Sequence, residues 1–190
     1  TASDTQYPEL LGEIPDPPEM LYVRGTLPAP EKVCVSVVGT RKATAEGKQQ
    51  AREVARALSA RGIVIVSGLA FGIDAAAHEG ALEGGGATVA VLAGGVDAVY
   101  PREHEQLAER ILENGGGLLS EHPVGTPALP HHFLERNRIV SGLSRAVVII
   151  EAPARSGALA TARYAALQGR EVFVVPGPAR HPHFTGSHML

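Results

Sequence analysis

Two short apolar runs rich in β-branched residues each end at a glycine and are followed by a helical pattern. The first run covers 33–38 and ends at Gly39, and the second covers 63–66 and ends at Ser67-Gly68. Similar runs follow at 88–93, 118–121, 146–150 and 171–175. Strands that alternate with helices form parallel βαβ units, and runs without polar alternation are covered on both faces. The sequence therefore predicts an α/β, Rossmann-like fold with a doubly wound, mostly parallel sheet and helices on both faces.

Capping residues and glycines divide the helical segments. The pattern predicts helices over about 44–61, 74–83, 102–114, 133–143 and 158–168. Thr44, Asp74 and Ser156 are the expected N-caps, because short polar side chains satisfy free amides at a helix start. Gly62 follows the first helix in the position that a left-handed C′ residue takes.

The first 32 residues differ in composition from the rest. Proline recurs there, as in 15–18 and 28–30, so a long helix is excluded. We expect a proline-rich N-terminal arm over 1–32, with a short edge strand at 21–25, packed on a single Rossmann-like domain over 33–190.

Charge is distributed unevenly along the chain. The net charge is −3, which argues against a generic polyanion binder. Residues 131–190, however, carry seven arginines and three glutamates and contain no lysine. Arginine suits bidentate phosphate contacts, although ordinary solvated surface explains the same count equally well.

Location is predicted from what the sequence lacks. The chain has no apolar run of membrane-spanning length and no basic-then-apolar leader, and its single cysteine, Cys34, lies in an apolar run. We expect a cytoplasmic protein without a membrane segment and with a buried, inert thiol.

The loop Gly39-Thr40-Arg41 lacks both the dinucleotide fingerprint and the P-loop pattern. A glycine turn, a hydroxyl, an arginine and a nearby helix start can still hold one phosphate. The alternative is that Arg41 is an ordinary surface side chain.

The loop 67–74 contains Ser67, Asp74 and, one helical turn later, His78. These residue types suggest a hydrolase triad, but the nucleophile elbow G-x-S-x-G is absent. We interpret Asp74 and His78 as a helix cap with a local pair.

Residues 133–142 form the most distinctive polar stretch. Arg136 and Arg138 flank Asn137 in an apolar segment, and buried arginines need partners. The partners are either nearby glutamates and helix carbonyls or a phosphate backbone, with Phe133 or Arg138 available for base stacking.

A further anion-compatible helix start follows the most apolar strand. Ser156-Gly157 begins a predicted helix and Thr161 follows one turn later. A plain N-cap explains the same residues equally well.

The eight histidines show no ligand set at zinc spacing. His131-His132 and His181-Pro182-His183 have no cysteine or carboxylate set beside them in the pattern. We therefore expect no metal site and no cofactor.

Seven motifs in order closely resemble the DNA-processing protein A family (DprA/Smf), and the resemblance covers about residues 7–190. They read V-V-G-T-R (37–41), S-G-L-A-x-G-I-D-x-x-A-H (67–78), Y-P (100–101), S-E-x-P (120–123), F-x-x-R-N-R-I-V-x-G-L-S (133–144), S-G-x-L-x-T-A (156–162) and G-R-E-V-F-x-V-P-G (169–177). The family's helical N-terminal and winged-helix C-terminal modules lie outside these residues. Leu134 departs from the family pattern, which usually has proline there.

The resemblance implies a single-stranded DNA-binding protein, not an enzyme, that acts in natural transformation and recombination. Its family protects incoming strands, helps load the RecA recombinase and forms homodimers. By resemblance, the DNA-binding residues are Gly39, Thr40, Arg41, Ser67, Gly68, Phe133, Arg136, Asn137, Arg138, Ser156, Gly157 and Thr161.

Two enzyme classes remain as rivals. One is a nucleotide-phosphate-binding enzyme of the lysine-decarboxylase-like Rossmann type, whose P-G-G-x-G-T-x-x-E motif does not continue after Pro176-Gly177. The other is a nicotinamide oxidoreductase, which the missing fingerprint disfavours.

Overall fold

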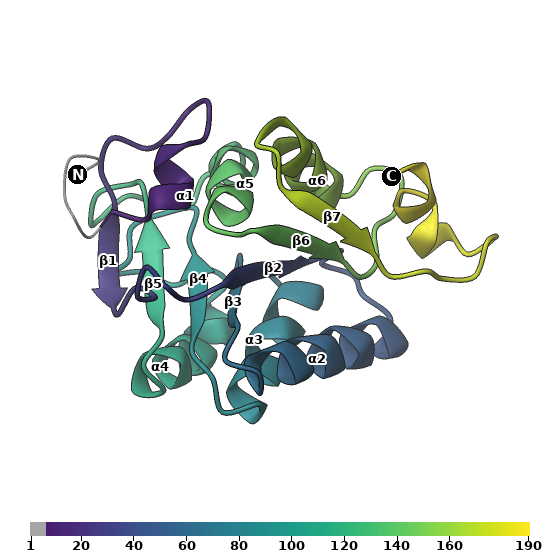
Figure 1. Cartoon of the computed structure of the whole chain (residues 1–190), viewed down its shortest axis with the longest axis horizontal. Coiled ribbons are helices and arrows are strands. Elements are labelled where there is room, and N and C mark those ends of the chain that lie inside the picture. The colour runs from purple at the N-terminus through teal and green to yellow at the C-terminus, as the bar shows by residue number, and fades with distance from the viewer. Residues whose placement is uncertain (1–6) are drawn as a thin grey trace.

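A computed structural model describes residues 7–190, so the first six residues of the predicted arm lie outside the described part. The strands form one seven-stranded sheet in the order β1-β5-β4-β3-β2-β6-β7 (Figure 1). Every neighbouring pair is parallel except β1 with β5. The strands are β1 (Tyr22–Gly25), β2 (Cys34–Val38), β3 (Val64–Ser67), β4 (Thr88–Val91), β5 (Gly117–Ser120), β6 (Ala146–Ile149) and β7 (Glu171–Val174).

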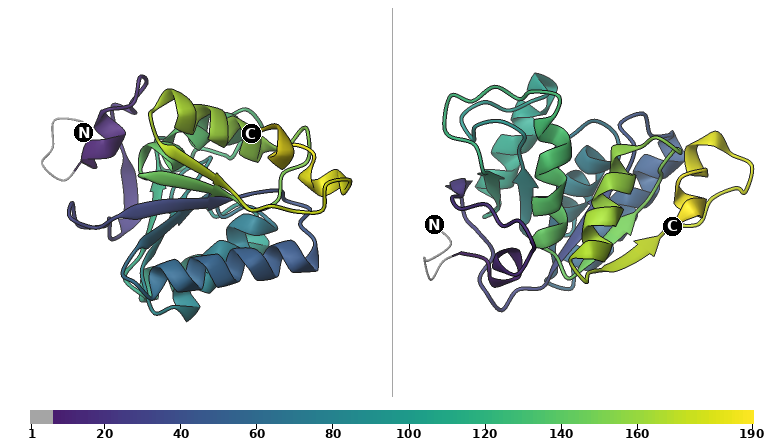
Figure 2. Two further views of the ribbon diagram at one scale, coloured as in Figure 1. Left: turned by 45° about the vertical axis from the view of Figure 1, so that its right-hand side comes forward. Right: turned by 90° about the horizontal axis from the view of Figure 1, so that it is seen from above.

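Helices cover both faces of this sheet (Figure 2). Helices α2, α3 and α4 lie on one face, and α1, α5 and α6 lie on the other. Their bounds are α1 (Glu9–Gly12), α2 (Ala45–Ser59), α3 (Ile73–Glu83), α4 (Glu105–Glu113), α5 (His132–Gly142) and α6 (Gly157–Leu167), with 3₁₀ turns η1 (Arg102–His104), η2 (Pro182–Phe184) and η3 (Ser187–Met189). The predicted doubly wound, mostly parallel α/β sheet is confirmed.

The central strands are apolar because both of their faces are covered. Every residue of β2, β3, β4 and β5 is buried. On one face, Val37 and Ile65 pack with Ala51 and Ala55 of α2, the residues that the helical spacing predicted. On the other face, Ile139 of α5 packs in the second core cluster. Burial on both sides accounts for the lack of polar alternation in these runs.

The N-terminal arm contributes an edge to the sheet. Its strand β1 pairs antiparallel with β5, with Tyr22 opposite Ser120, so the predicted edge strand is confirmed. Arg138 on α5 also donates to the Asp16 carboxylate of the arm at 3.0 Å. The division of the chain at residue 32 remains a prediction.

The order in which strands are added to the sheet switches from one side of β2 to the other. From β2 the chain proceeds through α2 to β3 on one side, whereas β6 lies on the other side of β2 and leads into α6. Because α2 and α6 cover opposite faces, the loops that follow β2 and β6 diverge. Such a switch point, at the carboxyl ends of the strands, is where open α/β sheets bind their ligands.

Two of the three predicted N-caps are confirmed. The Thr44 side chain accepts from the Gly47 amide, and the Ser156 side chain accepts from the Ala158 amide. The prediction for Asp74 is wrong, because α3 begins one residue after Gly72, which has a φ of +81°. A Cβ at Gly72 would lie 2.8 Å from the Arg41 carbonyl oxygen. The close approach of two loops, rather than a side-chain cap, therefore sets the start of α3.

Cys34 is a free, buried cysteine, and burial raises the pKa of its thiol to about 11. Its predicted burial is confirmed. Within the described residues, no helix combines the length and the apolar character needed to cross a bilayer.

Candidate nucleic-acid interface

A pocket of about 340 Å³ lies at the carboxyl ends of the strands, next to the switch point. The loops after β2, β3 and β6 form its wall together with the first turns of α5 and α6. Ten of the twelve predicted site residues line it, which are Gly39, Thr40, Arg41, Gly68, Phe133, Arg136, Asn137, Ser156, Gly157 and Thr161. The fold therefore unites motifs that are far apart in sequence, while their contact with DNA remains a prediction.

Arg41 is exposed at this pocket. Its guanidinium carbon lies 4.6 Å from the centroid of the Phe133 ring, which is a cation–π contact. The other partner of Phe133 is Tyr100, whose ring meets it edge-on with centroids 5.6 Å apart. These contacts orient the guanidinium while its N–H groups remain open to solvent.

Arg136 occupies a different environment from Arg41. It is only 4% exposed, and its Nη1 donates to the carbonyl oxygens of Gly68, at 2.8 Å, and Val91. Burial lowers its pKa to about 10, and the nearby Asp74 carboxylate opposes that change. Arg136 remains cationic at neutral pH, but its donors on this side are already bonded to the ends of β3 and β4.

The position of the Arg136 guanidinium requires glycine at residue 68. A Cβ at Gly68 would lie 2.6 Å from Cζ of Arg136. The Gly68 amide donates to the Asp74 carboxylate at 3.1 Å. Burial raises the pKa of Asp74, whereas the charge of Arg136 and backbone hydrogen bonds lower it. One buried acidic residue, Asp74 of α3, and one buried basic residue, Arg136 of α5, therefore lie close together at the pocket.

The predicted pairing of Asp74 with His78 is wrong. His78 is fully buried, and its Nδ1 lies 2.8 Å from the Thr88 hydroxyl. Ser67 is also fully buried and donates to the Val37 carbonyl oxygen at 2.7 Å. His78 therefore pairs with Thr88 and not with Asp74, so Ser67, Asp74 and His78 do not form a triad.

The start of α6 lies at the pocket, where the Ser156 side chain accepts from the Ala158 amide and the Gly157 backbone is accessible. Gly157 is exposed, and no described heavy atom lies within 4 Å of where its Cβ would be. Asn137 donates from Nδ2 to the Gly157 carbonyl oxygen at 3.3 Å, which links α5 to α6. The positive end of a helix with accessible backbone is suited to an anion.

The start of α2 is already filled by a carboxylate of the protein itself. Glu151 is fully buried and accepts from the Thr44 amide at 3.1 Å and from the Thr44 hydroxyl at 3.0 Å. His183 also contacts this carboxylate through Nδ1. The expectation that the helix after Gly39-Thr40-Arg41 helps to hold a phosphate is therefore corrected, because Glu151 takes that place.

Ser67 and Arg138 lie outside the pocket. Arg138 donates to both oxygens of Glu121, at 2.8 and 2.7 Å, and to Asp16. Of the two kinds of partner considered from the sequence, the structure gives Arg138 nearby carboxylates. Arg138 therefore does not line the pocket, because consecutive residues on a helix point in different directions and its side chain faces Glu121 and Asp16. Its predicted contact with DNA stays a prediction.

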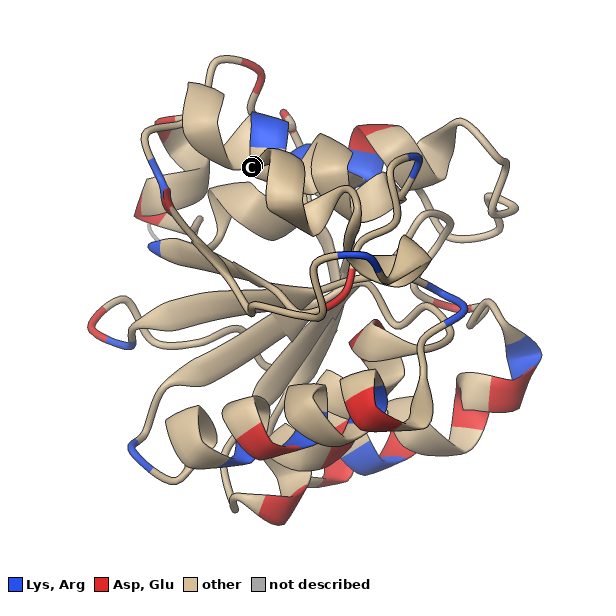
Figure 3. Ribbon diagram, turned by 90° about the vertical axis from the view of Figure 1, so that its right-hand side faces the viewer, with Lys and Arg blue, Asp and Glu red and all other residues tan. Residues whose placement is uncertain are grey.

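Arg155 is a pocket residue that sequence reasoning missed. It is exposed, it lines the pocket, and it directly precedes the cap of α6. The pocket wall thus holds three arginines and one aspartate, a formal charge of +2. Figure 3 shows acidic and basic residues interspersed over the helices in its view, so the pocket's positive charge is a local feature.

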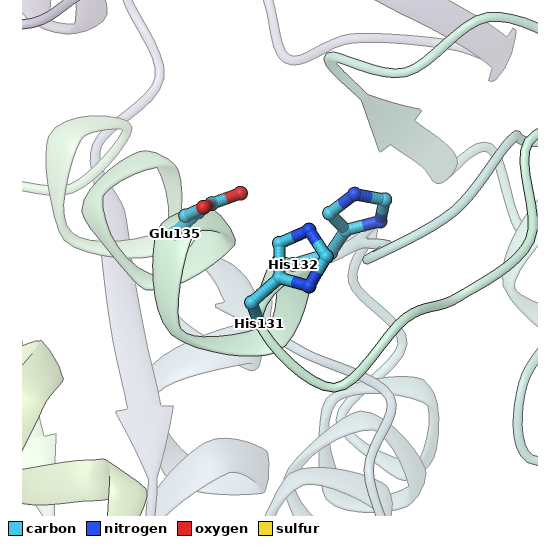
Figure 4. A group of neighbouring side chains, drawn as sticks. All are labelled: His131, His132 and Glu135. Carbon is cyan, nitrogen blue, oxygen red and sulfur yellow. The ribbon is translucent and has the colours of Figure 1, made fainter.

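A second polar cluster, at the start of α5, contains a carboxylate beside two histidines, which the sequence analysis did not expect. The ligand atoms of His131, His132 and Glu135 lie within 4.8 Å of one another at the start of α5 (Figure 4). The expectation that the histidine pair lacks a neighbouring carboxylate is wrong. Residues 131 and 135 are one helical turn apart, and this spacing in the sequence would have predicted that their side chains are neighbours.

A doubly wound sheet with a pocket at its switch point defines a Rossmann-like class of protein, and the cationic lining of this pocket suits an anion. The family model described as DNA recombination-mediator protein A matches residues 1–190. The chain belongs to that family.

Relatives and solved structures agree with this assignment. Protein Smf of Escherichia coli is 46% identical over 184 residues, which are 97% of this chain and 49% of the relative. DNA processing protein DprA of Bacillus subtilis is 44% identical over 185 residues, which are 97% of this chain and 62% of the relative. The chain spans about half to three-fifths of the length of these curated relatives.

The structure of DNA processing protein A from Streptococcus pneumoniae has a TM-score of 0.91 and 41% identity, over 98% of this chain and 65% of that one. DNA processing protein A from Helicobacter pylori, whose structure concerns its single-stranded DNA binding mode, has a TM-score of 0.85 and 32% identity, over 96% of this chain and 83% of that one. A molybdenum cofactor binding protein from Rippkaea orientalis shares the fold alone, with a TM-score of 0.56 and 17% identity over 79% of this chain and 80% of that one.

Proposed function

We propose that this chain binds single-stranded DNA through the pocket at the carboxyl edge of its sheet. The observation that carries the proposal is the exposed Arg41 guanidinium, held over Phe133 at the mouth of a cationic pocket. A phosphate requires open donors, and Arg41 and Arg155 present them beside the start of α6. Aromatic and guanidinium faces are also what unpaired bases stack on.

The shape of the site favours a single strand over a duplex. The pocket is a half-open hollow of about 340 Å³, and it offers three arginines. A flexible strand can turn a phosphate or a base into such a hollow, whereas a duplex keeps its bases stacked and its phosphates on a regular cylinder. The related protein from Helicobacter pylori is described with a single-stranded DNA binding mode, which supports the same ligand here.

The test is a gel-shift series with a labelled single-stranded oligonucleotide and its duplex, repeated across salt concentrations. We expect retardation of the single strand at lower protein concentration, with affinity falling steeply as salt rises because phosphate contacts release counterions. Equal affinity for both ligands, or affinity that does not change with salt, would contradict the proposal.

We infer a non-enzymatic role, and the contacts of the buried carboxyl support this inference. Asp74 lines the pocket but accepts from the Gly68 amide and lies near Arg136. That environment ties the group to the loop rather than presenting it to a substrate. The rival nucleotide-phosphate enzyme is tested by incubating the chain with nucleoside monophosphates, and release of free base would support the rival.

By family membership, we further propose that the chain acts in transformation and recombination, helps load RecA onto single strands, and does so as a homodimer in the cytoplasm. RecA loading is tested by the rate at which RecA assembles on an oligonucleotide with and without this chain. Light scattering after size-exclusion chromatography tests the dimer, and a monomer at micromolar concentration would contradict it.

A further inference from the structure

The start of α5 combines two imidazoles and a carboxylate in one place. His131 is the N-cap residue of α5, His132 is its first residue, and Glu135 follows one turn later. Each offers a ligand atom within 4.8 Å of the others (Figure 4). None of the three lines the cationic pocket, so the cluster is a separate feature with no role in the proposed DNA contacts.

His132 is held in the orientation that metal-binding histidines usually have. It is 9% exposed, and its Nδ1 lies 3.0 Å from the Ala93 carbonyl oxygen. Because a carbonyl oxygen only accepts, the hydrogen must be on Nδ1, and Nε2 then carries the free lone pair. A backbone carbonyl that fixes tautomer and ring direction in this way is the common second partner of a metal-bound imidazole.

Two neighbouring rings contact the His132 ring, and the His122 ring stacks on it with centroids 4.0 Å apart. The His131 ring meets the His132 ring edge-on, with centroids 4.4 Å apart, and His131 and Glu135 are exposed. A zinc-type ion needs each ligand atom about 2.0–2.2 Å from the metal, which in a tetrahedral site places the ligand atoms about 3.4 Å from one another. Separations of up to 4.8 Å must therefore shorten slightly. Rotation of the two exposed side chains about a fixed His132 provides that movement.

We propose that His131, His132 and Glu135 bind one divalent transition-metal ion of the zinc type at the first turn of α5. Two imidazoles and one carboxylate form a known donor set for zinc, with a fourth position left for water. The positive end of α5 disfavours a cation there, but the Glu135 carboxylate supplies a full negative charge at the same turn. Phe133 and Leu134 lie between the ligands, so an ion would fix the part of α5 that forms the pocket wall.

The experiment is calorimetric titration of Zn²⁺ into the untagged, metal-free 190-residue chain, without DNA. We expect one ion per chain and a loss of at least about tenfold in affinity in both His131→Ala and Glu135→Gln. His188→Ala is the matched control, because it also removes an exposed histidine, and its affinity should equal that of the unaltered chain. Since no DNA is present, the result is independent of the proposed function.

A second readout uses Co²⁺ in place of Zn²⁺. A four-coordinate site of nitrogen and oxygen ligands gives visible absorption that both variants should lose and the control should keep. The competing location is the pair His181 and His183, whose ring centroids are 5.3 Å apart. Binding that persists in His131→Ala and Glu135→Gln but disappears in His181→Ala would overturn the proposal, as would the absence of binding at about 100 µM metal.

Discussion

The guanidinium of Arg41 lies over the ring of Phe133, with Cζ 4.6 Å from the ring centroid. Arg41 follows β2 and Phe133 lies in the first turn of α5, so this contact joins two motifs that are distant in sequence. An exposed contact of this kind contributes about 0.5–1 kcal/mol, which orients a cation without burying it. The two motifs, predicted as separate phosphate ligands, thereby form one wall of a single pocket.

Arg138 should stabilise the fold and not contribute to DNA binding. In Arg138→Ala, the two hydrogen bonds to Glu121 and the one to Asp16 are lost. We expect the free energy of unfolding to fall by about 1–3 kcal/mol, because Glu121 loses its partner in a partly buried site. Urea denaturation measures the stability, and fluorescence anisotropy with an oligonucleotide should show affinity within twofold of the unaltered chain. A tenfold loss of affinity at unchanged stability would place Arg138 in the interface.

Substitution of Arg136 by lysine should destabilise the protein. Its Nη1 donates to two carbonyl oxygens, those of Gly68 and Val91, and a lysine ammonium is a compact, more strongly hydrated charge that fits a buried site less well than the delocalised guanidinium. We expect Arg136→Lys to cost about 1–3 kcal/mol of stability, the usual penalty for an unsatisfied buried group. Arg163→Lys is the control, because Arg163 is exposed on α6 and should change stability by less than about 0.5 kcal/mol. Equal urea midpoints for the two variants would show that the Arg136 guanidinium has no structural role.

His78 should make the protein acid-sensitive. Burial, followed by the charges of His104 and Arg136, lowers its pKa from 6.5 to about 3. The unfolded chain therefore binds the proton more tightly, and stability must fall as the pH drops from about 6.5 toward 3. Between pH 7 and pH 4.5 this group removes about 2–3 kcal/mol, at 1.36 kcal/mol per pH unit below 6.5.

The measurement is urea unfolding at both pH values for the unaltered chain, His78→Gln and His188→Gln. The His78 variant should lose most of that pH dependence, because glutamine does not titrate. The exposed His188 variant should keep it. If the two variants showed the same pH dependence, His78 would not be the group responsible.

The alternation of apolar runs with capped helices was sufficient to predict the sheet, the faces that the helices cover and the edge strand in the arm. The N-caps Thr44 and Ser156 were also predictable, because each side chain bonds an amide no more than three residues further along the chain. Asp74 was misjudged because a loop from another part of the chain, and not a cap, determines where α3 begins.

The site was harder to predict where partners are distant in sequence. Glu151 fills the start of α2 from the end of β6, and no local pattern indicates that contact. Arg136 shares a helix face with the buried Ile139 and Val140, so helical spacing did contain the signal for its burial. Arg155 lies in a loop without periodicity, and only the folded chain brings it to the pocket.

We propose above all that Arg41 and Arg155 bind phosphates of a single DNA strand. The most direct test is the salt dependence of affinity for an unstructured oligonucleotide, measured by anisotropy for the unaltered chain, Arg41→Ala/Arg155→Ala and Arg163→Ala. We predict that the double variant binds at least tenfold more weakly at low salt. Its slope of log K against log salt should be smaller by about 1.4, roughly 0.7 for each lost phosphate contact, and Arg163→Ala should match the unaltered chain. A double variant with the affinity and slope of the unaltered chain would contradict the account.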